Sequence, residues 1–234
     1  QVDSSVGGKT GVNTRHGKNL AGTFYQPKLV IADTSVLDSL PRRELLAGYS
    51  EVVKYGLIRD ASFFGWLEQY GEAVIDGDAD ARRHAIGESC RAKATVVAED
   101  ERESGVRALL NFGHTFGHAL ETETGFGREL LHGEAVAIGM MLALELSASL
   151  GLCPPADVVR TRAHFKSLGL PDGLPGDQGR HWSADGLIGH MGHDKKVSDG
   201  RIAFILANGV GDAFVAHDVD LDAVKTILEL AIAA

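Results

Sequence analysis

The sequence contains little cysteine and no long apolar run. Its 234 residues include two cysteines, Cys90 and Cys153, which are too few for the disulfide framework of a small secreted protein. No stretch approaches the roughly 18 uncharged apolar residues of a membrane-spanning helix, and we recognise no secretion signal. We therefore expect a cytoplasmic protein that does not enter a membrane.

Positive charge is also scarce. The chain carries 23 lysines and arginines against 32 aspartates and glutamates, a formal net charge of −9. Nucleic-acid binding is disfavoured, because a phosphate backbone requires a basic surface. An anionic small substrate is still compatible with this charge, since a pocket can be locally basic inside an acidic protein. The partner we expect is therefore a small molecule.

Nucleotide-binding fingerprints are absent too. The chain has no Gly-x-Gly-x-x-Gly, and the Gly-Gly-Lys-Thr at 7–10 lacks the spacing of a phosphate-binding P-loop. The sequence begins at Gln1, without a methionine, in the middle of a motif. We therefore expect a fragment, whose length and 44% hydrophobic content suffice for one large domain or one domain and part of another.

Hydrophobic periodicity predicts a mainly α-helical fold. Residues 1–24, rich in Gly, Ser, Thr and Asn, are expected to form a loop, and short strands are expected at 28–33 and 201–206. Glycine and proline separate the helical patterns. Helices are expected over 42–57, 61–70, 78–100, 106–123, 132–150, 155–168 and 218–233.

One of these predicted helices carries a narrow polar stripe. Wound at about 100° per residue, the polar side chains of 107–121 fall within about 80° of arc, between apolar flanks. The members of the stripe are Arg107, Asn111, His114, His118 and Glu121. Such a stripe is how a helix lines a polar cavity inside a protein, because a surface helix turns its charges outward over a wider face.

Histidines and a carboxylate predict a metal site. His114 and His118 are four residues apart, which suits two ligands on one helix face. His132 opens an almost wholly apolar segment, and Glu51 offers a carboxylate. Two imidazoles and one carboxylate, with an open fourth position, form the ligand set of a catalytic zinc site. Spacing alone leaves open which two of the three histidines bind. Six other histidines are expected to be structural or surface residues: His84, His164, His181, His190, His193 and His217.

Basic side chains are candidates for holding an acidic ligand. Arg107 suits a bidentate contact with a carboxylate, whereas lysines and backbone N–H groups suit a phosphate. Lys54 and Lys93 lie among apolar residues, and Lys54 is three residues from Glu51 on the same helix face. The remaining lysine candidates are Lys9, Lys18, Lys195 and Lys196.

Several motifs, in this order along the chain, resemble the 3-dehydroquinate synthase family. They are Val-Asp-Ser-Ser-Val-Gly-Gly-Lys-Thr-Gly at 2–11, Gly-Lys-Asn at 17–19, Tyr-Gln-Pro at 25–27, Glu-Val-Val-Lys-Tyr-Gly at 51–56, Asn-Phe-Gly-His-Thr-Phe-Gly-His-Ala-Leu-Glu at 111–121, His-Gly-Glu-Ala-Val-Ala-Ile-Gly-Met at 132–140 and Asp-Lys-Lys at 194–196. The resemblance runs nearly from end to end. It implies a lyase of the shikimate pathway, which leads to the aromatic amino acids.

The implied reaction converts 3-deoxy-D-arabino-heptulosonate 7-phosphate into 3-dehydroquinate and phosphate. It proceeds by transient oxidation with NAD+, phosphate elimination, re-reduction and intramolecular aldol closure, with a bound divalent metal, Zn2+ or Co2+. The resemblance implies Glu51, His114 and His132 as metal ligands, and so selects His114 over His118. His118 would serve the substrate near its phosphate.

The resemblance assigns further roles by position. Catalytic roles are implied for Lys9, Lys54, Lys93, Arg107, Asn111 and His118. Substrate contacts are implied for Asp3, Asn19, Glu103 and either Lys195 or Lys196. Cofactor contacts with NAD+ are implied for Lys9, Lys18 and Asn19.

The implied architecture has two unequal parts. Residues 41–234 would form the multi-helical, metal- and substrate-binding C-terminal domain, and 1–40 the end of an N-terminal α/β NAD+-binding domain that is mostly missing. The family also implies a homodimer. Alternatives are another sugar-phosphate cyclase, of the valiolone or inosose synthase type, and a catalytically inert metal-binding fragment. Metal-dependent alcohol dehydrogenases of the glycerol dehydrogenase type resemble the chain only around its histidines.

Overall fold

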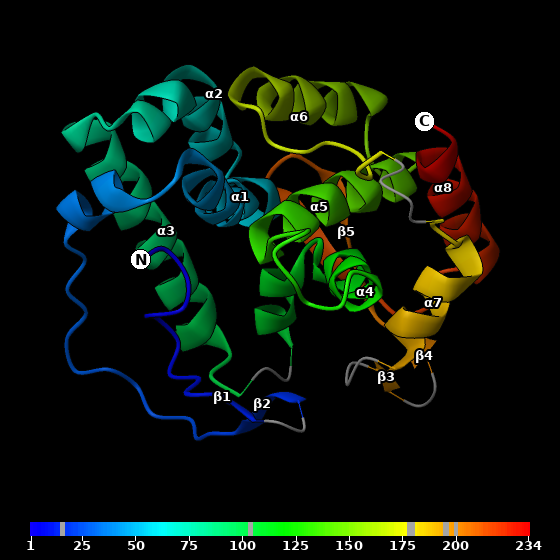
Figure 1. Ribbon diagram of the computed structural model, residues 1–234, viewed down its shortest axis with the longest axis horizontal. Coiled ribbons are helices and arrows are strands. Elements are labelled where there is room, and N and C mark those ends of the chain that lie inside the picture. Colours follow the sequence, from blue (N-terminus) through cyan, green and yellow to red (C-terminus); the bar gives the residue numbers. More distant parts are fainter. Residues whose placement is uncertain (15–16, 103–104, 177–180, 194–196, 199–200) are drawn as a thin grey trace.

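Helices build most of the protein. The computed structural model describes residues 1–14, 17–102, 105–176, 181–193, 197–198 and 201–234 (Figure 1). The α-helices are α1 Arg42–Arg59, α2 Ala61–Asp76, α3 Ala79–Glu99, α4 His114–Glu123, α5 His132–Ser149, α6 Pro155–Leu168, α7 Ala184–His193 and α8 Leu221–Ala233. Two 3-10 helices are η1 Thr34–Ser39 and η2 Val106–Asn111. The mainly α-helical prediction is confirmed.

Strands form only small antiparallel pairs among the described residues. They are β1 Val12–Thr14 with β2 Gly17–Ala21, β3 Val197–Ser198 with β4 Arg201–Ile202, and β5 Phe204–Gly209 with β6 Asp212–Ala216. The first pair corrects the prediction of a loop over 1–24. The predicted strand at 201–206 is present but divided at Ala203, between β4 and β5.

Helix α5 is the centre of the hydrophobic core. It packs against α1, α4, α6, α8 and β5, and Figure 1 shows it near the middle of the view, beside α1 and α4. A helix that is apolar on every face is stable only when other elements surround it. Burial of each large apolar side chain contributes about 1.5–3 kcal/mol, so the buried residues of α5 stabilise its packing against these elements.

Two glycines of α5 permit this close packing. A Cβ atom at Gly133 would lie 1.9 Å from the Ala47 carbonyl oxygen on α1. A Cβ at Gly139 would lie 2.0 Å from the carbonyl oxygen of Gly113, which immediately precedes α4. Any larger residue would push these backbones apart. The glycines therefore set the distances at which α1 and the start of α4 meet α5.

The predicted helix over 106–123 is two segments rather than one. Residues 106–111 form η2, the chain is extended at Phe112, and α4 begins at His114. Gly113 between them has φ +79°, a left-handed conformation that interrupts the helix. A Cβ there would lie 2.7 Å from the Met140 backbone nitrogen. The predicted polar stripe is therefore divided, with Arg107 and Asn111 on one segment and the histidines on the other.

The predicted strand at 28–33 is wrong. Within the described part of the chain this segment pairs with no strand, and it runs outside the helices between β2 and η1 (Figure 1). Leu29 is 75% exposed and Ile31 is 82% exposed. Its β-branched residues favour a strand only when a neighbouring strand and a covering layer are available.

Helix α7 was not predicted, because few of its residues are apolar and buried. Leu187 and Met191, four residues apart, are its two almost fully buried side chains.

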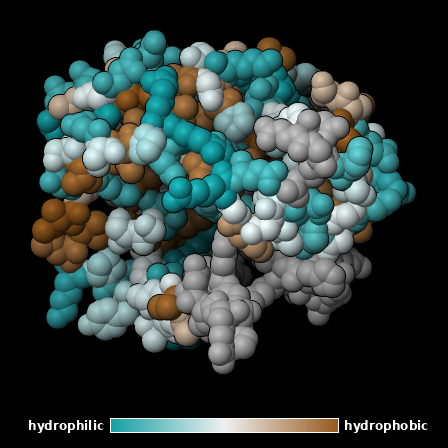
Figure 2. Space-filling view, in the orientation of Figure 1, coloured by the Kyte–Doolittle hydropathy of each residue, from teal (hydrophilic) through white to brown (hydrophobic). Residues whose placement is uncertain are grey.

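On the face of the molecule in Figure 2, hydrophobic side chains form separate patches among hydrophilic ones. Within the described residues, the helices are each too short or too polar to cross a membrane.

One buried histidine makes the stability of this fold depend on pH. His164 on α6 is 5% exposed and lies 3.2 Å from the Tyr49 hydroxyl. Burial lowers the pKa of His164 from 6.5 to about 4. Between these values the unfolded chain binds more protons than the folded one, so stability rises with pH.

We expect His164→Gln to reduce this dependence. Glutamine keeps a hydrogen-bonding group near Tyr49 but does not titrate. Protonation linkage at His164 should destabilise the wild-type protein by about 2 kcal/mol between pH 8 and pH 5. Urea unfolding at both pH values measures the difference, and the variant should lose correspondingly less. Equal losses in the two proteins would contradict the effect assigned to His164.

Candidate metal centre

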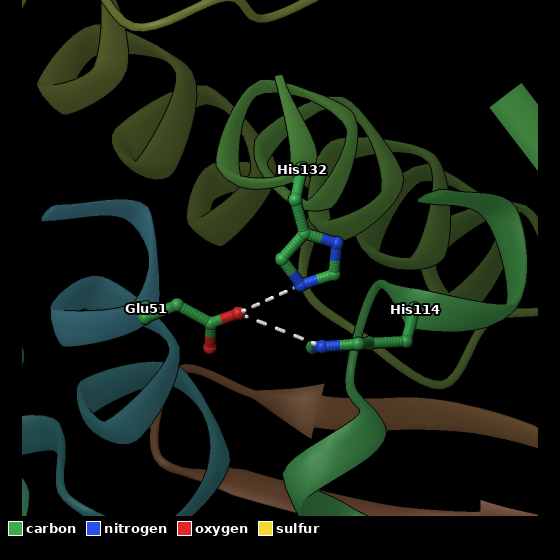
Figure 3. Close-up of side chains that lie close together, drawn as sticks. All are labelled: Glu51, His114 and His132. Atoms are coloured by element: carbon green, nitrogen blue, oxygen red, sulfur yellow. Dashed lines mark ion pairs between the residues drawn. The ribbon is translucent and has the colours of Figure 1, made fainter. Parts of the chain in front are cut away.

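Three side chains from three helices converge on one point. Glu51 extends from α1, while His114 and His132 are the first residues of α4 and α5 (Figure 3). The Glu51 Oε1 atom lies 3.5 Å from Nε2 of each histidine, and the ligand atoms of all three residues lie within 4.8 Å of one another. An ion with tetrahedral bonds of about 2.1 Å holds its ligand atoms roughly 3.4 Å apart. The observed spacing is close to that of an ion cage.

A hydrogen bond to the backbone orients His114 as a metal ligand. Its Nδ1 atom lies 3.2 Å from the Phe112 carbonyl oxygen, which can only accept, so Nδ1 carries the hydrogen. Burial lowers the pKa of His114 to about 4, which keeps the ring neutral. The lone pair of Nε2 then faces a Glu51 oxygen. Two electron-rich atoms facing each other this closely fit a cation between them.

His132 lies on the open side of the centre. Its side chain is 47% exposed, whereas those of Glu51 and His114 are about 10% exposed. Burial lowers the pKa of His132, but hydrogen bonds with Glu121 and Glu51 outweigh this effect and raise it to about 9. The surrounding carboxylates therefore favour positive charge at this point. A partly exposed edge also leaves room for a further ligand, as catalytic metal sites require.

Lysine neutralises the carboxylate of the centre. The Lys54 Nζ atom lies 2.5 Å from Glu51 Oε2. The histidines lie nearest the other carboxylate oxygen, Oε1. Burial raises the pKa of Glu51, but the charge of Lys54 and the smaller effect of the two nearby histidines outweigh burial and hold this pKa well below its usual range. Glu51 is therefore ionised, with one oxygen paired to Lys54 and the other facing both imidazoles.

A second cluster adjoins this pair. The carboxylate of Asp3 lies 3.9 Å from Lys54 Nζ and 3.0 Å from Lys93 Nζ, and it accepts a 2.8 Å hydrogen bond from the Tyr55 hydroxyl. Both lysines are buried, at 1% and 8% exposed. The predicted residues Asp3, Lys54 and Lys93 therefore lie together beside Glu51. The prediction missed Tyr55, whose position four residues after Glu51 on α1 was its only signal.

Arg107 anchors the opening loop. It is 1% exposed, and its Nη1 and Nη2 atoms donate to the carbonyl oxygens of Glu101 and Gly7 at 2.6 and 2.7 Å. Gly7 has φ +105°, and a Cβ there would lie 2.9 Å from Arg107 Nη2. Arg107 therefore holds the loop that carries Asp3. Asn111 lies at the end of η2, one turn further along.

The other predicted residues are more dispersed. The His118 ring lies one turn beyond His114 on α4, with centroids 5.4 Å from His114 and 6.1 Å from His132. Lys9 is exposed and forms a backbone bridge with Phe24. The backbone of Lys18 and Asn19 lies in β2. Glu103, Lys195 and Lys196 lie outside the described residues.

The fold and the convergent site together define a class. Over 99% of the chain, the structure superposes with a TM-score of 0.86 and 30% identity on 2-epi-5-epi-valiolone synthase from Streptomyces hygroscopicus subsp. jinggangensis, solved with NAD+ and Zn2+ bound. It matches 2-deoxy-scyllo-inosose synthase, complexed with carbaglucose-6-phosphate, NAD+ and Co2+, over 98% of the chain with a TM-score of 0.81 and 27% identity. The chain covers 63% and 64% of those chains. The protein has the fold of the sugar-phosphate cyclases.

The chain belongs to the 3-dehydroquinate synthase family. Residues 48–197 match the family model described as 3-dehydroquinate synthase C-terminal, and residues 1–47 match the one described as 3-dehydroquinate synthase N-terminal. Curated 3-dehydroquinate synthases from Rhodospirillum rubrum and Caulobacter vibrioides are 61% and 57% identical, over 100% and 97% of the chain. The chain spans 61% and 62% of their lengths. The resemblance noted in the sequence is thus confirmed.

Proposed function

We propose that this chain forms the metal- and substrate-binding part of a 3-dehydroquinate synthase. The reaction would convert 3-deoxy-D-arabino-heptulosonate 7-phosphate to 3-dehydroquinate and phosphate. The convergence of Glu51, His114 and His132, in a chain of this family, is the observation that supports it. When bound, a divalent ion such as Zn2+ supplies Lewis acidity at a substrate hydroxyl, and NAD+ accepts and returns a hydride.

The side chains of the centre have distinct roles in this proposal. Glu51, His114 and His132 hold the ion, and Lys54 keeps the Glu51 carboxylate ionised and oriented. His118, one turn from His114, binds the substrate beside the ion. Lys93 and Asp3 would contact the substrate beside Lys54, with Lys93 bonded to both the backbone and the side chain of Asp3.

Holding one reactive molecule in a fixed orientation is a large part of the catalytic task, because proximity alone can contribute several kcal/mol. The phosphate is proposed to lie toward His118, Asn19 and one of Lys195 and Lys196, and the acid group toward Lys9 and Arg107. Glu103 and Asn111 are proposed to contact the substrate, and Lys9, Lys18 and Asn19 to contact NAD+. We also propose that the whole protein is a cytoplasmic homodimer.

Phosphate release tests this function. Intact-length protein is incubated with NAD+, zinc and each of three substrates: the heptulosonate phosphate, a neutral heptulose phosphate and a hexose phosphate. We expect release from the heptulosonate phosphate alone, with no net NADH. Release only from a neutral sugar phosphate would instead indicate a valiolone or inosose synthase, and accumulation of NADH would indicate a dehydrogenase.

Substitution of Arg107 should weaken substrate binding in the intact-length enzyme. Arg107→Lys replaces a forked donor with a single ammonium group, which cannot hold the Gly7 and Glu101 carbonyls together. Losing one buried charged hydrogen bond costs about 1.5–3 kcal/mol of stability, which loosens the loop that carries Asp3, and we expect KM to rise about tenfold. Arg42→Lys, at a pair with Asp76 in which both side chains are about 60% exposed, is the control. An unchanged KM for Arg107→Lys would contradict the proposal that Arg107 supports substrate binding.

A further inference from the structure

Glu121 contacts His132 on the side of the ring away from Glu51. It lies in the last turns of α4, is 4% exposed, and its Oε2 atom lies 3.0 Å from His132 Nδ1. This is the nitrogen opposite the one that faces Glu51. A carboxylate can only accept, so the contact places a hydrogen on Nδ1. Nε2 is then the nitrogen that binds an ion, which displaces the proton there.

His132 requires such a partner more than His114 does. The His114 ring is buried and held by a backbone carbonyl, which no substitution can remove. The His132 ring is about half exposed, so packing restrains it less. Its backbone is fixed, because Glu134 accepts from the Leu131 N–H and from Arg43, which ties the start of α5 to α1. The orientation of the ring then depends on Glu121.

The distances favour this role over direct ligation. The ligand atoms of His118, Glu121 and His132 also lie within 4.8 Å of one another. However, 3.0 Å between Glu121 Oε2 and His132 Nδ1 is a hydrogen-bond length, shorter than the roughly 3.4 Å between two ligands of one tetrahedral ion. The 3.5 Å distances from Glu51 to the two histidines leave room for a shared ion. The 3.0 Å distance from Glu121 to His132 is that of a hydrogen bond.

We propose that Glu121 is a positioning residue that fixes the tautomer and the ring orientation of His132 for metal binding. The inference rests on the proposed metal centre and extends it to a residue outside the ligand set. Partners of this kind raise the basicity of the imidazole ligand, and their loss typically lowers metal affinity about 10- to 100-fold.

Zinc affinity measured by chelator competition on the full 234-residue chain tests the proposal. We expect Glu121→Gln, which keeps an acceptor but no charge, to weaken zinc binding about tenfold, and Glu121→Ala to weaken it by up to about 100-fold. The matched control is Glu123→Gln, two residues further along α4, where the carboxylate lies 2.8 Å from His190 Nε2. This control should bind zinc as the wild type does.

Nitrogen NMR of labelled histidines supplies a second readout. In the zinc-free wild type, the neutral His132 ring should carry its hydrogen on Nδ1, and a mixture of the two neutral tautomers should appear in the zinc-free Glu121→Ala variant. A role confined to stability would change neither this signature nor the order of affinities. Circular dichroism monitors folding, and if Glu121→Ala does not fold, the nearly isosteric Glu121→Gln decides.

Failure of the inference is distinguishable from failure of the proposed function. Wild-type protein that binds no zinc would overturn the metal centre itself. Stoichiometric binding in the wild type, with equal affinity in both Glu121 variants, would overturn only the role of Glu121. A second equivalent of zinc that is lost in Glu121→Ala would make Glu121 a ligand, which also contradicts a positioning role.

Discussion

His132→Ala is expected to reduce bound zinc from stoichiometric to near zero and to abolish turnover of the intact-length enzyme. The substitution removes one of three ligands and leaves only Glu51 and His114, with two open positions. Tight zinc sites use three or four protein ligands. Elemental analysis after dialysis measures the loss directly.

The fold should survive this change, because the His132 side chain is 47% exposed and little core contact is lost. Removing it also leaves Glu121 without that hydrogen-bond partner, so a loss of about 1–2 kcal/mol in unfolding free energy is expected. His190→Ala is the matched control, since His190 is 31% exposed and also pairs with a glutamate. Zinc retained by His132→Ala at the wild-type level would contradict the ligand assignment.

Gly133→Ala is expected to damage both the fold and the metal centre. The added Cβ would lie 1.9 Å from the Ala47 carbonyl oxygen, so α1 and α5 must separate. Overpacking against a backbone atom at the core justifies an expected loss of about 3 kcal/mol or more. Because Glu51 and His132 come from these two helices, zinc affinity should fall as well.

Gly48→Ala on α1 is the control for this experiment. No atom lies within 4 Å of the Cβ it would add, and alanine favours a helix over glycine by about 1 kcal/mol. This variant should be as stable as the wild type or slightly more stable. Urea denaturation and chelator competition compare the two. Wild-type stability in Gly133→Ala would mean that α1 and α5 are not packed as described.

Sequence periodicity predicted the long helices because their apolar positions repeat over many turns. It failed at Gly113, although the composition of 106–123 suits a helix. The backbone there is left-handed, and Met140 lies too close for a Cβ atom. It also failed at 28–33, where a strand-forming run finds no partner strand within the described chain. Both errors depend on contacts with distant residues, which local patterns do not contain.

The candidate site was partly predictable for a similar reason. Residue type and spacing pointed to Glu51 and the histidines, and the structure places Glu51, His114 and His132 together and Lys54 beside them. Spacing could not choose between His114 and His118, because both follow one face of α4. The choice depends on where α1 lies, and the close contact at Gly133 determines that position.

The convergence of three helices has a consequence for how tightly folding and metal loading are linked. Glu51 belongs to α1, far along the chain from the first residues of α4 and α5, so an unfolded chain cannot present the three groups together. Zinc that binds only the native state adds its binding free energy to conformational stability. The melting temperature would then rise with free zinc and fall with chelators, which makes thermal denaturation a reporter of metal occupancy.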